Sequence, residues 1–169
     1  MPERLSDDEF DALLTERDAF KLAIRGQAAL EAELHASIAE AFPGQMPAEL
    51  QRLSFPTRLA LAEAVGVVPP NFRACFQAFA SLRHDSAHGD IQDLTIERAW
   101  QLRELMLNTI SEDQREDIRS KLGKSEPVYT PVLVLAYLRT VIKTAHVKRA
   151  SGATENVTRL QSKRQFKRS

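Results

Sequence analysis

The sequence predicts an all-α protein, an antiparallel bundle of four to five main helices. Apolar residues recur at the spacing of one helix face along most of the chain. Capping residues precede these periodic segments, and glycine or proline follows them. No segment has the strict apolar-polar alternation of a half-buried strand. The 169 residues suffice for one domain with a core. We expect a single helical domain over residues 1–149 and a flexible basic tail over residues 150–169.

The first helical segment begins with a capping box. Ser6 is the expected N-cap, with Glu9 three residues later, and Leu5 and Phe10 occupy the positions of a hydrophobic staple. The helical period then continues as far as Pro43. We therefore predict one long helix here, or two helices with a break near Gly26.

The middle of the chain is divided by glycine and proline. A short helical turn is expected over residues 47–53, and Ser54 is the expected N-cap of a helix that Gly66 ends. Pro69-Pro70 requires an extended link. The next helix is predicted to begin at Asn71 and to end at Gly89.

Three more helices are expected toward the C-terminus. Thr95 is a suitable N-cap for a helix through Ile110, and residues 111–123 begin with a second capping box and end in glycine. Thr130-Pro131 provides an N-cap and N1 proline for a last helix that ends near residue 148. Its first turns are apolar on all sides, so we expect them to be buried in the bundle or in a dimer.

Composition excludes several classes of protein. The chain is 43% hydrophobic and 27% charged, which is ordinary for a globular protein. The single cysteine, Cys75, excludes an intrachain disulfide and is expected to pack as a small hydrophobe. There is no secretory signal and no apolar run long enough to span a bilayer. We therefore expect a cytoplasmic protein with no membrane partner.

The formal net charge is zero, but the charges are unevenly distributed. Residues 143–169 contain eight lysines and arginines and one glutamate, whereas residues 1–42 contain ten acidic and four basic residues. A basic segment can attract RNA or DNA by charge alone, or it can serve only as a solubilising terminus. The candidate nucleic-acid-binding residues are Lys148, Arg149, Lys163, Arg164, Lys167 and Arg168.

The richest stretch for chemistry is Arg-His-Asp-Ser-Ala-His-Gly-Asp, residues 83–90. It contains two of the four histidines and follows a stripe of Phe72, Phe76 and Phe79 at the spacing of one helix face. Arg83 is the next position on that face, which directs it toward a core or an interface and requires an anionic or carbonyl partner. His88 comes five residues later, about 140° round an ideal helix.

This stretch resembles the signature of the HEPN superfamily (higher eukaryotes and prokaryotes nucleotide-binding domains), in which an arginine and a polar residue are followed, after three more residues, by histidine. Arg83, His84 and His88 fill those positions. The preceding segment, residues 54–68, is similar to its counterpart in the mannitol operon repressor branch. The resemblance covers roughly residues 15–110. It implies an antiparallel helical bundle that dimerises through the motif-bearing helices.

The resemblance also implies a metal-independent endoribonuclease of the toxin or defence type. In that chemistry the ribose 2′-oxygen attacks the adjacent phosphate, which gives a cyclic phosphate and a free 5′-hydroxyl. His88 would transfer protons near neutral pH, and Arg83 would bind the phosphate as its charge grows. His84 would orient either group or contact the phosphate. The expected partners are RNA, a second copy of the chain, and an antitoxin or regulatory protein. No cofactor is expected.

Two other interpretations of the motif stay open. His84 and His88 have the i, i+4 spacing of a zinc-binding helix, with Asp85 in place of the usual glutamate, but no clear third ligand follows. Alternatively, Arg83 pairs with Asp85 or Asp90, and His88 is an ordinary residue at a helix end. In that case the chain is a non-catalytic regulatory or binding module, such as a transcriptional regulator resembling the mannitol operon repressor family.

Overall fold

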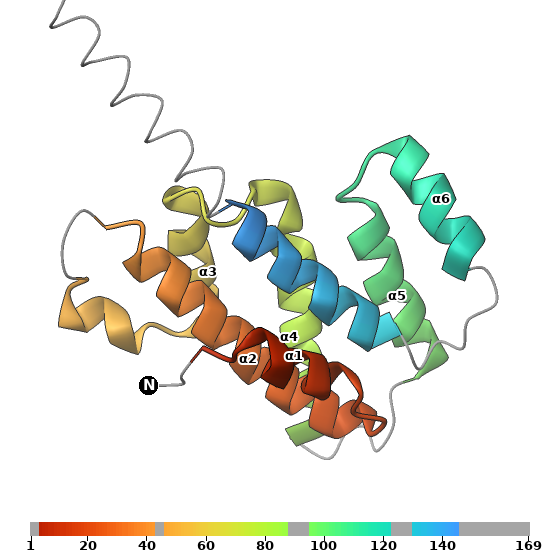
Figure 1. The fold of residues 1–169 in the computed structure, drawn as a ribbon, viewed down its shortest axis with the longest axis horizontal. Coiled ribbons are helices and arrows are strands. Elements are labelled where there is room, and N and C mark those ends of the chain that lie inside the picture. The colour runs from red at the N-terminus through yellow and green to blue at the C-terminus, as the bar shows by residue number, and fades with distance from the viewer. Residues whose placement is uncertain (1–3, 43–45, 88–94, 123–129, 146–169) are drawn as a thin grey trace, which may run out of the picture.

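The computed structural model describes residues 4–42, 46–87, 95–122 and 130–145, with only the backbone for residues 20, 51, 83–87, 117, 118 and 120–122. No strand occurs within these ranges, so the predicted all-α class is confirmed. Figure 1 shows the arrangement of the helices. In chain order they are α1 (Asp7–Leu14), α2 (Ala19–Ala39), the 3-10 helix η1 (Ala48–Arg52), α3 (Phe55–Ala64), the 3-10 helix η2 (Pro70–Phe72), α4 (Arg73–Ala87), α5 (Ile96–Leu107), α6 (Glu112–Leu122) and a last helix over residues 130–145.

The capping box at the start of α1 is confirmed. The Ser6 side chain accepts a hydrogen bond from the Glu9 amide (3.2 Å), and the Glu9 carboxylate accepts one from the Ser6 amide (2.8 Å). Both predicted alternatives, one long helix and two helices with a break near Gly26, are wrong, because α1 ends at Leu14 and α2 begins at Ala19. Asp18 then accepts a hydrogen bond from the Lys21 amide (3.1 Å), as an N-cap residue does.

Gly26 lies inside α2 and permits close packing there. A Cβ atom at this position would lie 2.8 Å from Leu135 Cδ2 and 3.1 Å from Phe79 Cζ. Both neighbours are fully buried. The glycine therefore allows α4 and the helix over residues 130–145 to approach α2, which explains why it does not end the helix.

Helices α2 and α4 lie at the centre of the fold. α2 contacts α1, α3 and α4, and α4 also contacts α5 (Figure 1). Of the predicted aromatic stripe, Phe76 and Phe79 lie on α4 and are fully buried in the core cluster, whereas Phe72 lies in η2 and is partly buried. Leu30 and Leu34 of α2 belong to the same cluster. α4 is thus anchored along its length before it reaches the motif.

A buried ionic cluster joins the N-terminus to the last helix. Arg139 donates to the carbonyl of Leu5 (3.0 Å), pairs with Asp7 (3.0 Å) and lies 3.6 Å from the carboxylate of Glu33. Its guanidinium carbon is 4.1 Å from the centroid of the Phe10 ring. Lys143 also pairs with Asp7, and the two cations lower the pKa of that carboxyl group, Lys143 more strongly.

The link between α3 and α4 follows the predicted punctuation with two local differences. Gly66 has a φ of 72°, the left-handed conformation that ends α3. Ser54 occupies the N-cap position, but its hydroxyl bonds to Thr57 Oγ1 (2.9 Å) and not to a backbone amide. α4 begins at Arg73 and not at Asn71, because η2 occupies the two preceding positions.

The C-terminal helices agree with the prediction at their starts more than at their ends. The Thr95 hydroxyl accepts a hydrogen bond from the Arg98 amide (3.3 Å), which confirms the N-cap of α5. α5 ends at Leu107 and not at Ile110. In the last helix Val134 and Leu135 are fully buried while Leu133 is exposed, so its first turns are only partly covered. Within the described ranges, no helix is long and apolar enough to cross a membrane.

Candidate functional site

The motif lies at the C-terminal end of α4. The backbone is helical through Ala87, so Arg83 and His84 lie within the last five residues of α4. Position 83 is one turn beyond the buried Phe79 and on the same side of the helix backbone. The core therefore fixes the direction in which this end of α4 points.

The remaining candidate residues lie outside the described part of the chain. His88 follows the last described residue of α4, and the side chains of Arg83 and His84 are not described, so their mutual geometry stays a prediction. The same holds for every candidate of the basic tail: Lys148, Arg149, Lys163, Arg164, Lys167 and Arg168.

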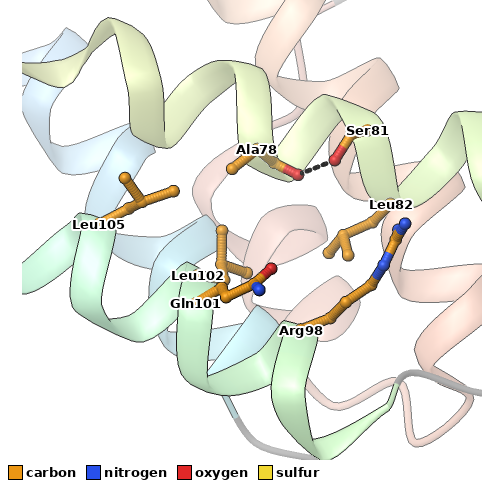
Figure 2. Close-up of a pocket in the computed structure, with 7 residues that line it drawn as sticks. All are labelled: Ala78, Ser81, Leu82, Arg98, Gln101, Leu102 and Leu105. Carbon is orange, nitrogen blue, oxygen red and sulfur yellow. Dashed lines mark hydrogen bonds between the residues drawn. The ribbon is translucent and has the colours of Figure 1, made fainter.

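A pocket of about 150 Å³ lies between α4 and α5, and its lining on α4 reaches Leu82, the residue before the motif (Figure 2). Its lining residues are Ala78, Ser81, Leu82, Arg98, Gln101, Leu102 and Leu105. Arg98 extends from α5 toward Leu82, the residue immediately before Arg83. The Ser81 hydroxyl is turned back to its own helix, where it donates to the Ala78 carbonyl (2.7 Å). The other polar side chains that line the pocket are those of Arg98 and Gln101.

The pocket places Arg98 of α5 near the C-terminal part of α4, which also carries Arg83 and His84. α5 runs back along α4 from this end, since Arg98 lies near Leu82 while Leu105 lies near Ala78 (Figure 2). Sequence analysis did not identify Arg98, because its distance from the motif depends on how α5 packs. The start of α5 and the end of α4 thus form one side of the candidate site.

A second feature of α5 also escaped sequence analysis. The guanidinium carbon of Arg103 lies 4.8 Å from the centroid of the Trp100 ring. Arg103 is only 8% exposed, whereas Trp100 is 44% exposed. The i, i+3 spacing of these residues was visible in the sequence. Their unequal burial depends on tertiary packing, and it was not predictable from that spacing.

Cys75 is not a candidate nucleophile. Its side chain is fully buried in α4, and burial raises its pKa to about 12. A thiol with such a pKa is almost entirely protonated at neutral pH and therefore unreactive. The predicted role as a small hydrophobic residue is confirmed, since Cys75 belongs to the core cluster.

His35 is the one histidine whose side chain is described. It lies on α2, and burial lowers its pKa, with a smaller contribution from the nearby charge of Arg58. Arg58 itself pairs with Glu31 (3.2 Å) and donates to the Leu53 carbonyl (3.0 Å). At neutral pH His35 is therefore predominantly neutral. Its substitution is a suitable control for substitution of the motif histidines.

Among the described side chains, no group of three histidine, cysteine or acidic residues is placed to hold a metal ion. The zinc interpretation of His84 and His88 concerns side chains outside that set. Comparison of the chain with models of known protein families, with curated proteins and with solved structures finds no match.

Proposed function

We propose that this protein is a metal-independent endoribonuclease of the HEPN toxin or defence type, acting as a homodimer. The observation that carries the proposal is the position of the Arg-His pair. Arg83 and His84 lie in the last five residues of a helix whose preceding turns are anchored in the core, and the pocket between α4 and α5 reaches Leu82. Catalysis by positioned groups requires such a rigid support.

The proposed reaction is attack of a ribose 2′-oxygen on the adjacent phosphodiester. His88 takes or gives the proton, because an imidazole titrates near neutral pH. Arg83 binds the phosphate oxygens, where a planar guanidinium donates two hydrogen bonds at once. The bond to the 5′-oxygen breaks, the leaving oxygen receives a proton, and a cyclic phosphate remains on the other fragment. His84 orients one of these groups.

The α4–α5 pocket supports this assignment through its charge and location. Arg98 adds a cation beside Leu82, the residue that immediately precedes Arg83 on α4. Leu82 and Leu105 form an apolar part of the pocket wall, which can exclude water from a bound group. The basic residues beyond position 148 would add attraction for the RNA backbone by counterion release. An antitoxin or regulatory protein would cover the same end of α4.

The test is incubation of the purified chain with mixed RNA in the presence of EDTA. We expect cleavage that is lost in Arg83→Ala and in His88→Ala and retained in the matched controls Arg52→Ala and His35→Gln. Arg52 is an exposed arginine of η1, and His35 lies on α2. Cleavage that stops on chelation would support the zinc interpretation. Binding of RNA without cleavage by any variant would support a regulatory module instead.

A further inference from the structure

Arg103 is a buried cation that has no counter-ion among the residues that the structure describes. Its Nε has no hydrogen-bond partner, and no carboxylate of the described residues pairs with its guanidinium. Arginine stays protonated at any physiological pH, so burial does not neutralise it. The neighbouring carboxylate of Glu104 is already paired with Arg119 of α6 (3.2 Å). The unmatched charge of Arg103 therefore calls for an anion from outside these residues.

Trp100 provides the flat surface beside this cation. The guanidinium carbon of Arg103 lies 4.8 Å from the centroid of the Trp100 ring, yet Trp100 is 44% exposed. Ile96, one turn earlier on α5, is 59% exposed and extends the apolar surface. Proteins that bind single-stranded nucleic acids use an exposed aromatic ring next to a cation, because bases stack on the ring and phosphates bind the cation.

We propose that Trp100 and Arg103 form a subsite for one nucleotide of single-stranded RNA, with the base stacked on Trp100 and its phosphate bound by Arg103. This inference rests on the proposed function, because it takes RNA as the substrate. The same helix carries Arg98 near Leu82, so the subsite lies on the element that borders the end of α4.

A single tryptophan makes the subsite directly observable. The whole chain contains no other tryptophan, so intrinsic fluorescence reports on Trp100 alone. The probe is a short single-stranded oligonucleotide with 2′-O-methyl groups throughout, which cannot undergo attack by a 2′-oxygen. We expect saturable quenching of the tryptophan emission on titration. An otherwise identical abasic oligonucleotide should bind more weakly and cause little quenching.

Substitution of Arg103 separates a ligand-binding role from a structural one. Arg103→Met should weaken binding by roughly tenfold or more, through loss of charge-assisted hydrogen bonds. It should also leave the melting temperature of the free protein unchanged or higher, because an unpaired buried charge is removed. The control Arg119→Met removes the same charge from an exposed position of α6 and should change affinity less than threefold. Arg103→Lys, which retains the charge but not the planar fork, should lie between wild type and Arg103→Met.

Several results would overturn the subsite. Saturating binding by anisotropy without any change in Trp100 emission would contradict base stacking. Equal affinity of the two methionine variants would contradict phosphate binding by Arg103. Emission that changes with protein concentration and not with oligonucleotide would assign the surface to a contact between copies of the chain. Quenching by the oligonucleotide without cleavage of ordinary RNA would support the subsite and contradict only the proposed reaction. Cleavage of ordinary RNA without quenching would support the reaction and contradict the subsite.

Discussion

Gly26 of α2 and Leu135 of the last helix are in such close contact that a Cβ atom on the glycine would lie 2.8 Å from Leu135 Cδ2. The Gly26→Ala substitution should therefore destabilise the protein, even though alanine is the better helix former by about 1 kcal/mol. Overpacking of a tight core costs about 1–3 kcal/mol, so after the gain in helix propensity we expect a net loss of up to about 2 kcal/mol in chemical denaturation.

The second variant that tests this contact is Gly26→Ala combined with Leu135→Val. Shortening the leucine side chain removes the atom closest to the new methyl group. The double variant should therefore lose less stability than the sum of the two single variants. Additive losses, or a Gly26→Ala protein more stable than wild type, would show that α2 and the last helix do not approach as closely as described.

The buried ionic cluster at Arg139 leads to a second prediction. Arg139→Met removes the cation shared by Asp7 and the nearly fully buried Glu33, although Arg4 remains within 2.7 Å of Glu33. Breaking a buried pair on one side costs about 3–5 kcal/mol, and the remaining Arg4 contact should hold the loss near the lower value. Urea denaturation measures it. Adding Glu33→Gln to Arg139→Met should recover part of the loss, and a wild-type stability for Arg139→Met alone would be inconsistent with the cluster.

Burial of Cys75 predicts how the free energy of unfolding depends on pH. Its pKa is about 12 in the folded chain and about 8.5 for a free thiol, so the unfolded chain ionises first. The stability that this group contributes is complete below pH ~8.5 and falls as pH rises toward 12, by up to about 1.4 kcal/mol per pH unit. The free energy of unfolding of wild type should therefore fall more steeply above pH ~9 than that of Cys75→Ala. Native protein should also resist thiol reagents at pH 8, and rapid labelling under those conditions would contradict the buried position.

Local signals along the chain were sufficient for several helix boundaries. Ser6, Thr95 and Gly66 act where capping and glycine rules placed them, because those rules concern a few neighbouring residues. The break at Gly26 was misassigned because the reason for that glycine is contact with Leu135, a residue distant in sequence. A rule that uses only residues adjacent in the sequence cannot distinguish a glycine that ends a helix from one that allows another helix to pack closely.

The candidate site was predictable to a similar degree. The stripe of Phe76 and Phe79 correctly indicated the buried face of α4 and hence a helix that carries Arg83 at its end. The contributions of Arg98 and of the Trp100–Arg103 pair depend on the packing of α5 against α4 and on differences in burial between adjacent turns. Neither property can be inferred from residue spacing alone.

The proposed homodimer can be tested by subunit mixing. One motif supplies few groups for a reaction that needs both a proton acceptor and a proton donor, so we expect two copies to share one site. Sedimentation at micromolar concentration should show a dimer. Inactive Arg83→Ala mixed with inactive His88→Ala should recover part of the cleavage activity after exchange of protomers, while each variant alone stays inactive. A monomer at working concentration would exclude the shared site.

The most direct test of the proposed reaction is cleavage of an RNA oligonucleotide in EDTA, with analysis of the product ends. Attack by the 2′-oxygen predicts a cyclic phosphate on one fragment and a free 5′-hydroxyl on the other. A single 2′-deoxy substitution at the cleaved linkage should abolish cutting there. Products with a 5′-phosphate and a 3′-hydroxyl, continued cutting at the deoxy position, or full activity in His88→Ala would contradict catalysis by the motif at the end of α4.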